Sequence, residues 1–513
     1  MSQSKKSYFL QILAVAAISL FVVLPTLIGV FHKIPGKTFT GNTFYFDPWD
    51  VNVYVSAVNY SQKFGFDFEN MYTTENFPNR VNLYPLYSLT GTLFKNINPF
   101  LVYYLLIISA IYVFVLVVGK TIKFVIPVPL NRFYFIILLS LSGGFGWLLF
   151  GNIPSADITT TPFTFLNMLQ RPHATAAISF YIASLISFYR FSQTKAKKYL
   201  TLSIISLFVF AIFYPYLLLS FYATIFIYSL FLYHTEKNTL GIKTVLKIFF
   251  LTLIPAAIYS LYILKGSQFK GVLSPNLPTP QILYIFLGHG VFLTGLIYQI
   301  FNKKRSNLST FLIIWYLSGI LLSYAPISFS RYYLSSLFFP ITLLLYISKK
   351  DLLKMIKSIH LRTTLVVIFI FFGTLTSWVI LFVRILAVSM SSRWAYLDES
   401  YFDIFKFLNR NSPSGSGVMV TYPISNFIPV YTYNKVYLGH GAQTFNAVEK
   451  DALQKRFYDL TISEDGLNSI IKSNVRYAVV ENNSVDMYLN LNSQTTKIGS
   501  VYQSGNYTLL EFR

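Results

Sequence analysis

The sequence contains no cysteine and few charged residues. Without cysteine, disulfide bonds, thiolate nucleophiles and iron–sulfur clusters are excluded. Only 12% of the 513 residues are charged and 54% are hydrophobic, whereas about 25% of the residues in soluble proteins are charged. This composition excludes an ordinary cytosolic enzyme and a disordered chain, and it predicts a polytopic membrane protein.

Eleven apolar stretches are candidates for membrane-spanning helices, which need about 20 predominantly apolar residues. Residues 8–30 lack a small-residue cleavage site, so we expect a retained first span rather than a signal peptide. Residues 199–233 form either one long helix or two helices that are separated at Pro215. With two helices there, the predicted spans are 8–30, 99–119, 133–150, 173–190, 199–214, 215–233, 247–265, 281–301, 309–325, 331–348 and 363–388.

The positions of lysine and arginine favour two helices at Pro215. With eleven spans, the short basic clusters between apolar stretches all lie on one side, as the positive-inside bias requires. The sequence therefore predicts a multi-pass protein of the cell membrane with a cytoplasmic N-terminus and an extracytoplasmic C-terminus. The same clusters account for the net charge of +22 without a nucleic-acid partner.

Carboxylates are absent from the predicted spans. Of the 19 acidic residues, only Glu236 and Asp351 lie on predicted cytoplasmic segments, and the others are extracytoplasmic. Ionisable groups within spans usually mark ion or proton pathways. The pattern therefore argues against an ion-coupled transporter and predicts that any chemistry takes place at the outer membrane face.

Two outer segments are long enough to carry that chemistry. We expect one domain at 1–388, which includes an outer loop at 31–98, and a second at 389–513. The second segment alternates helical and strand-like periods, which is typical of a small α/β domain. Its predicted helices and strands are 398–411, 445–460 and 465–473, and 418–422, 435–439, 476–481 and 507–512, respectively.

The first outer loop contains a predicted helix with an acidic start, at residues 46–65. Pro48 suits the first helical position and Gly65 suits the stop. Asp47 is then a good N-cap, and Asp50 is placed where acids favour the helix dipole. Capping explains both acids without catalysis, so the residues alone leave both roles open.

Short motifs spread over most of the chain resemble a known superfamily. They are D-V-N-V-Y (50–54), N-M-Y-T-T-E-N (70–76), L-Y-P-L-Y-S-L-T-G (83–91), S-G-G-F-G-W (142–147), M-L-Q-R-P-H (168–173) and V-Y-L-G-H-G-A-Q-T-F-N (436–446). With an early acidic outer loop and many spans, the chain resembles the GT-C superfamily of integral-membrane glycosyltransferases. The likeness is to bacterial relatives of the protein mannosyltransferase and aminoarabinose transferase families, as an architecture with loose motifs.

The resemblance implies roles for several residues. It places the catalytic function on Asp50, with Asp47 as partner or substitute, either as general base or as ligand of a divalent cation such as Mg²⁺ or Mn²⁺. The adjacent acidic pair usual in the superfamily is replaced here by D-P-W-D at 47–50. Tyr54, Glu75 and His440 are further candidates for substrate binding, although the glycines beside His440 also fit a tight turn.

Basic residues and one acid near the predicted outer face are further candidates. The guanidinium of Arg331 suits a phosphate, although interfacial arginines are common. Arg171 and His173 flank a helix-starting proline, so they either cap or bind substrate. Asp157 is either a second outer carboxylate or a turn former. His289 lies within a predicted span, where a packed core histidine is the more common case.

We therefore expect a polytopic α-helical membrane protein with a GT-C-like core and a small extracytoplasmic α/β domain. The expected activity moves a monosaccharide from a polyprenyl-phosphate donor to a glycolipid, glycan or protein of the envelope. Its partners are that donor, membrane lipids and the acceptor, and a divalent cation is the only cofactor in question. The alternatives are a lipid-linked glycan polymerase or ligase, a non-catalytic transporter or flippase, and a member of the superfamily that keeps the fold without catalysis.

Overall fold

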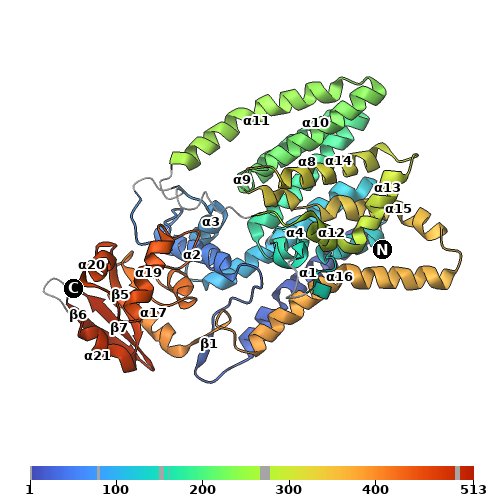
Figure 1. The fold of residues 1–513 in the computed structure, drawn as a ribbon. Coiled ribbons are helices and arrows are strands. Elements are labelled where there is room, and N and C mark those ends of the chain that lie inside the picture. Colours follow the sequence, from blue (N-terminus) through green and yellow to red (C-terminus); the bar gives the residue numbers. More distant parts are fainter. Residues whose placement is uncertain are drawn as a thin grey trace. The chain divides into compact units, whose positions relative to one another are not determined.

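The computed structural model describes residues 3–77, 81–149, 155–160, 162–265, 278–327, 329–491 and 497–513. The described chain is mostly helical (Figure 1). It divides into two compact units. The first unit comprises Met1–Val23, Leu106–Tyr259 and Asn276–Phe382. The second comprises Leu24–Leu105 and Val383–Arg513, together with a short segment that begins at Ser260.

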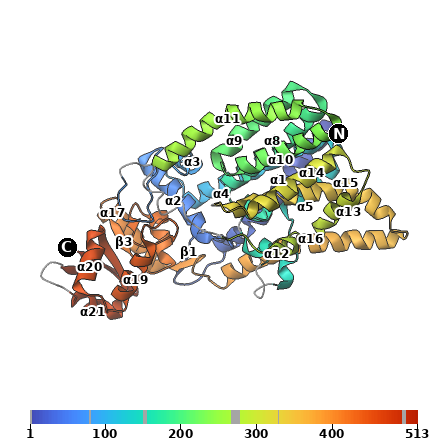
Figure 2. The same ribbon diagram turned by 45° about the horizontal axis from the view of Figure 1, so that its top comes forward.

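Helices form nearly all of the first unit, and α8, α10 and α14 lie side by side in both views (Figure 1, Figure 2). Small polar residues let helices approach closely: Ser184 and Ser203 each donate a hydrogen bond to the other's backbone carbonyl, at 2.8 and 2.9 Å. The helices wholly or mostly in this unit are α1 (Gln3–Phe31), α4 (Pro99–Thr121), α5 (Pro129–Ser140), α6 (Ala156–Thr159), α7 (Phe165–Leu169), α8 (Pro172–Thr194), α9 (Lys197–Phe213), α10 (Leu217–Glu236), α11 (Leu240–Lys265), α12 (Ile282–His289), α13 (Leu293–Phe301), α14 (Asn307–Ser323), α15 (Phe338–Lys354) and α16 (Ile359–Ser389).

The predicted spans coincide with these helices, and Pro215 separates α9 from α10 as the two-helix alternative requires. Two predicted helices are too long. The one at 133–150 ends at Ser140, before the glycines of S-G-G-F-G-W, and the one at 331–348 begins only at Phe338 because Ser336 has a left-handed φ of 73°.

Six helices in the described residues are long and apolar enough to cross a membrane. They are Lys5–Phe31, Pro99–Phe124, Pro172–Thr194, Leu217–Glu236, Ile282–Phe301 and Ile359–Ser389. Their length and apolarity support integration into a membrane. The number of eleven spans and the sidedness of the chain stay predictions.

In the second unit, the first loop folds around the helix that its sequence predicts. Helix α2 (Pro48–Phe64) is followed by α3 (Pro85–Leu93), and Gly65 ends α2 with a φ of 81°. Strand β1 (Lys37–Phe39) pairs antiparallel with β2 (Tyr396–Asp398). This pairing joins the first loop (31–98) to the C-terminal segment (389–513).

A five-stranded mixed sheet with the order β4-β3-β5-β7-β6 forms the centre of the C-terminal segment. Strands β3 (Gly417–Met419), β4 (Lys435–Val436) and β5 (Val475–Glu481) are parallel, and β7 (Tyr507–Phe512) is antiparallel to β5 and to β6 (Ile498–Ser504). Helices predicted from the sequence appear as α17 (Glu399–Asn411), α19 (Ala447–Tyr458) and α20 (Glu464–Lys472). Strand β6 and the short helices α18 (Ile428–Tyr431) and α21 (Val485–Leu489) have no counterpart in the sequence-based prediction.

Alternation along the strands places apolar side chains on both faces of this sheet. Val418 and Val479 pack with α17 and α18 on one face, in the cluster that also holds Val53 of α2. Met419 and Val480 pack with α19, α20 and α21 on the other. The first loop is thus part of the core of the C-terminal segment, which fixes the position of α2.

Candidate active site

Asp50 and His440 form a hydrogen-bonded pair although they are 390 residues apart in the sequence. Nε2 of His440 lies 2.7 Å from Oδ1 of Asp50. The side chain of His440 is only 7% exposed, whereas that of Asp50 is 28% exposed. A buried imidazole therefore orients a carboxylate that a solute can still reach.

The start of α2 gives its two acids different environments. Asp47 occupies the N-cap position with a left-handed backbone, φ 45° and ψ 59°, and its side chain makes no capping hydrogen bond. The prediction that Asp47 caps through its side chain is therefore wrong, because effective N-cap side chains need an extended backbone to reach the first turn. Asp50 lies in the first turn, where the helix dipole stabilises its negative charge.

A tight turn holds His440 in place. The backbone carbonyl of His440 accepts hydrogen bonds from the amides of Gln443 and Thr444, at 2.9 and 2.8 Å. Thr444 donates its hydroxyl to the carbonyl of Tyr72 at 2.7 Å, and the ring of Tyr72 lies edge-on to the imidazole at a centroid distance of 6.2 Å. The turn predicted from the flanking glycines is present, and it presents His440 to Asp50.

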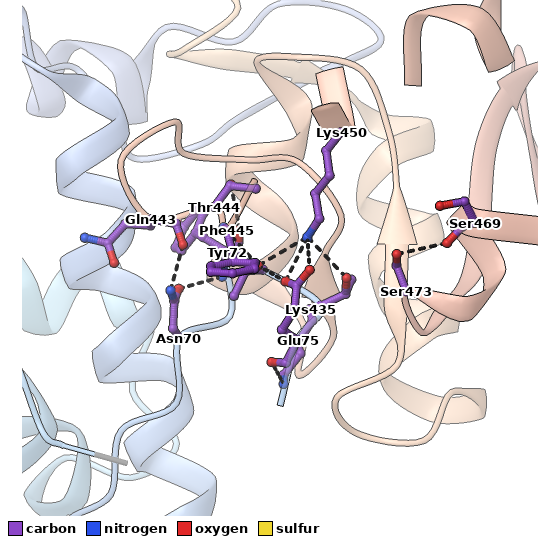
Figure 3. Close-up of polar contacts among 12 residues, drawn as sticks. Asn70, Tyr72, Glu75, Lys435, Gln443, Thr444, Phe445, Lys450, Ser469 and Ser473 are labelled. Atoms are coloured by element: carbon purple, nitrogen blue, oxygen red, sulfur yellow. Dashed lines mark hydrogen bonds and ion pairs between the residues drawn. The ribbon is translucent and has the colours of Figure 1, made fainter. Parts of the chain in front are cut away.

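Two sequence motifs, residues 70–76 of the first loop and 436–446 of the C-terminal segment, meet at this turn (Figure 3). Asn70 donates its side-chain amide to the carbonyl of Gln443 at 2.7 Å. Nearly buried Lys450 contacts Glu75 at 2.8 Å. Burial lowers the pKa of Lys450, and Glu75 partly offsets this effect. The structure thus gives Glu75 a structural counter-ion, and its role in substrate binding stays a prediction.

A second lysine strengthens the same junction. Lys435, 1% exposed, lies 2.8 Å from a carboxylate oxygen of Glu69 and donates to the carbonyl of Glu75 at 3.0 Å and the side chain of Asn76 at 2.7 Å. Both lysines belong to the C-terminal segment, and their ammonium groups bind residues of the first loop. They therefore fix the position of the loop that carries Asp50.

Tyr54 belongs to a stack of aromatic rings. Its ring lies 5.0 Å from that of Tyr87 at an interplanar angle of 9°, and it also stacks with Tyr103 and meets Tyr84 edge-on. With 7% of its surface exposed, Tyr54 mainly packs α2 against α3 and the start of α4. Its predicted contact with substrate remains untested.

In the first unit, two predicted phosphate ligands lie beside one aromatic cluster. The ring of His173 is 5.6 Å from that of Tyr214, which is 6.2 Å from that of Tyr332. The guanidinium carbon of Arg331, in the 3-10 helix Ser330–Leu334, is 5.8 Å from the centroid of Tyr332. Arg171 is the N-cap residue of α8 and is 4% exposed.

Asp157 is fully buried in the first unit and is held by four hydrogen bonds. Its carboxylate accepts from the amides of Gly144 and Gly146, at 2.9 and 3.3 Å, and from the hydroxyls of Ser155 and Thr376, at 2.5 and 2.8 Å. A Cβ on Gly146 would lie 2.3 Å from Oδ1 of Asp157, and one on Gly144 would lie 2.2 Å from the backbone oxygen of Leu287. The glycines of S-G-G-F-G-W therefore close tightly around Asp157, which gives this acid a structural role.

His289 is also buried, as expected for a packed core histidine. Nδ1 of His289 is 3.2 Å from the hydroxyl of Tyr316, and its ring lies 4.5 Å from that of Phe163 and 4.9 Å from that of Phe338.

The side chains around Asp50 do not form a complete protein ligand set for a metal ion. Across the part of the chain that the structure describes, no three histidine or acidic side chains are grouped to hold one ion. One oxygen of Asp50 already faces Nε2 of His440. Mg²⁺ is usually held by one or two carboxylates together with waters and substrate phosphates, so the divalent cation stays a prediction and we assign no step to it.

Comparisons with known proteins give structural neighbours only. No family profile matches the chain, and no curated protein matches it in sequence. Crystal structures of the oligosaccharyltransferase of Archaeoglobus fulgidus, tethered to an acceptor peptide or in complex with Zn and sulfate, align with TM-scores of 0.49 and 0.45. They are 13% and 14% identical and cover 90% and 92% of this chain, and the alignments span 69% and 68% of those chains.

The same archaeal enzyme, AglB, in complex with an inhibitory peptide and a dolichol-phosphate, aligns with a TM-score of 0.47 at 13% identity. That alignment covers 94% of this chain and 70% of the other. TM-scores below 0.5 do not establish a common fold.

Proposed function

We propose that the protein is a membrane glycosyltransferase in which Asp50 is the general base. It moves a monosaccharide from a polyprenyl-phosphate donor to a hydroxyl of an envelope glycolipid, glycan or protein. The motifs that resemble the GT-C superfamily support this assignment. The observation that carries it is the contact between Asp50 and His440, because a buried imidazole orients a carboxylate that remains accessible.

The reaction is a single displacement at the anomeric carbon. The acceptor hydroxyl loses its proton to the Asp50 carboxylate as its oxygen bonds to the anomeric carbon. The bond from that carbon to the phosphate oxygen breaks, and the lipid phosphate leaves with the bonding electrons. The configuration of the sugar is therefore inverted. A positioned base contributes about 10²- to 10⁴-fold to such a transfer.

His440 prepares Asp50 for this role. In the neutral tautomer with the proton on Nε2, His440 donates to Oδ1 of Asp50 and so holds the carboxylate in one orientation. A single oriented carboxylate lowers the entropy cost of reaching the reactive geometry. His440 is a positioning residue in this account, and Asp47 is the second acid of the same helix start.

The leaving phosphate needs donors that stabilise its charge. We assign Arg331 to the donor phosphate, because a guanidinium binds two phosphate oxygens at once, and Arg171 and His173 to supporting contacts. The roles of Arg331, Arg171, His173 and Asp50 can each be tested by substitution of that residue alone.

Transfer measured in proteoliposomes tests the proposal. The donors are undecaprenyl-phosphate hexoses and pentoses, and the acceptors are extracted envelope glycolipids. Asp50→Asn should lower kcat by at least about 10²-fold, while the matched control Asp67→Asn, on the same loop, should retain activity. Full activity of a folded Asp50→Asn protein would contradict the role of Asp50. Addition of many sugar units per acceptor would favour the polymerase alternative.

A further inference from the structure

A large cavity lies in the C-terminal segment, separate from Asp50 and His440. Its volume is about 700 Å³, within the 300–1,000 Å³ usual for ligand sites. It is lined by Val420 and Thr421, which follow β3, and by Val479–Glu481, which end β5. Neither Asp50 nor His440 lines it.

The topology of the sheet makes this the expected place for a ligand. Strands β3 and β5 are parallel neighbours, so their carboxyl ends meet at the same edge. From β3 the chain continues to β4 on one side and then crosses back to β5 on the other. Open α/β sheets bind ligands at the carboxyl ends of strands where the strand order reverses in this way.

Tyrosines dominate the aromatic part of the wall, and hydrogen bonds hold several of them. The hydroxyl of Tyr458 donates to the carbonyl of Val479 at 3.1 Å, and that of Tyr488 donates to the carbonyl of Tyr458 at 3.2 Å. The wall is thus rigid and aromatic without being wholly apolar. The lining tyrosines are Tyr396, Tyr401, Tyr458, Tyr488 and Tyr507.

The charged groups of the wall balance one another. Lys37 and Arg393 are opposed by Asp398 and Glu481. A site for a phosphate or nucleotide would have an excess of positive charge, which this cavity lacks. Carboxylates accept hydrogen bonds from hydroxyl groups, and the side chain of Asn483 both donates and accepts.

We propose that this cavity is a binding site for an uncharged saccharide. The hydroxyl groups of the sugar bond to Asp398, Glu481 and Asn483, and its C–H faces pack on the tyrosine rings. This site holds a saccharide without reacting with it. The inference goes beyond the transfer reaction and does not depend on the chemistry of Asp50.

Calorimetric titration of the full chain in lipid nanodiscs tests the proposal, since nanodiscs avoid detergents with sugar headgroups. The probes are maltose, lactose, mannobiose and chitobiose, with trialanine and glucose 1-phosphate as non-saccharide and anionic comparisons. We expect at least one disaccharide to bind. Glu481→Ala and Thr421→Trp should each weaken its binding tenfold or more, because the first removes an acceptor and the second fills the cavity from an exposed position.

Two further variants separate this site from the transfer site. Glu464→Gln removes an exposed acid that does not line the cavity, and Asp50→Asn removes the proposed base; both should bind the disaccharide as the wild type does. Failure of all four disaccharides to bind, or equal binding by Thr421→Trp, overturns the inference. Loss of binding in Asp50→Asn also overturns it, because the sugar then occupies the transfer site.

Discussion

Oδ1 of Asp50 lies 2.7 Å from Nε2 of His440, and this contact joins the start of α2 to a turn in the C-terminal segment. Lys435 and Lys450 reach from the same segment to Glu69 and Glu75 of the first loop. The carboxylate proposed as the base therefore depends for its position on residues that lie more than 350 positions later in the chain.

His440→Ala should lower kcat by up to about a hundredfold, because without its hydrogen bond the Asp50 carboxylate leaves the reactive geometry. KM for the donor should change little, because His440 contacts Asp50 and not the donor in this account. The pH profile of kcat should move, since Asp50 loses a hydrogen-bond donor. Transfer kinetics at several pH values measure both effects.

Two variants make this result specific. His440→Gln keeps an N–H donor and should recover part of kcat, and His360→Ala removes an exposed histidine and should behave as the wild type. If His440→Ala and His440→Gln lose activity equally while both proteins remain folded, orientation of Asp50 by a hydrogen bond is not the role of His440.

Glu75→Gln should destabilise the second unit by about 2 kcal/mol. Removing one partner leaves the charge of nearly buried Lys450 uncompensated, and such losses reach about 3–5 kcal/mol when both partners are buried. The effect is smaller here because Glu75 is 29% exposed. The double variant Glu75→Gln/Lys450→Met should recover much of the loss in denaturant unfolding. Asp451→Asn, which breaks the exposed pair with Lys455, is the control and should change little.

Glu511 should make the stability of the folded protein depend on pH in the acidic range. Burial raises the pKa of Glu511, but hydrogen bonds from Arg513 and Arg476 outweigh it and hold the pKa below its usual value of 4.5. The unfolded state therefore binds more protons than the folded state just below pH 4.5, and the stabilisation, complete above that pH, is lost as the pH falls through the folded pKa. The difference in melting temperature between wild type and Glu511→Gln should be largest at neutral pH and shrink below pH 4.5. A difference independent of pH would contradict this assignment.

Asp157→Asn should reduce the yield of folded protein while leaving the kcat of the folded fraction nearly unchanged. The amide replaces one of the oxygens that accept from Gly144, Gly146, Ser155 and Thr376, so at least one of these buried donors loses its partner. The measurement is the kcat of each protein, normalised to its amount of folded protein. A large loss of kcat at normal yield would instead support the catalytic role that the sequence left open.

Local patterns in the sequence predicted local structure well. Pro48 and Gly65 marked the ends of α2 because each restricts or permits a particular backbone conformation. Alternating apolar residues marked β5 and β7. Strand β6 was missed because I-G-S-V-Y-Q-S has little apolar alternation, and the strand exists through its pairing with β7.

The pair of Asp50 and His440 was not predictable as a contact, although each residue was a candidate. Nothing local to either residue encodes a distance across 390 positions, because the packing of the first loop against the sheet sets it. The left-handed backbone of Asp47 was not predictable either, because an acid directly before a helix usually caps its first turn through the side chain. The glycines that flank His440 were the one local signal of a constrained turn.

The most direct test of the central claim is mass spectrometry of the lipids that co-purify with wild type and with Asp50→Asn. The account predicts that the folded variant retains a polyprenyl-phosphate sugar that the wild type turns over when envelope acceptor is added. Absence of any isoprenoid-linked sugar from both proteins would contradict the proposed donor, and turnover by Asp50→Asn at the wild-type rate would contradict the proposed base.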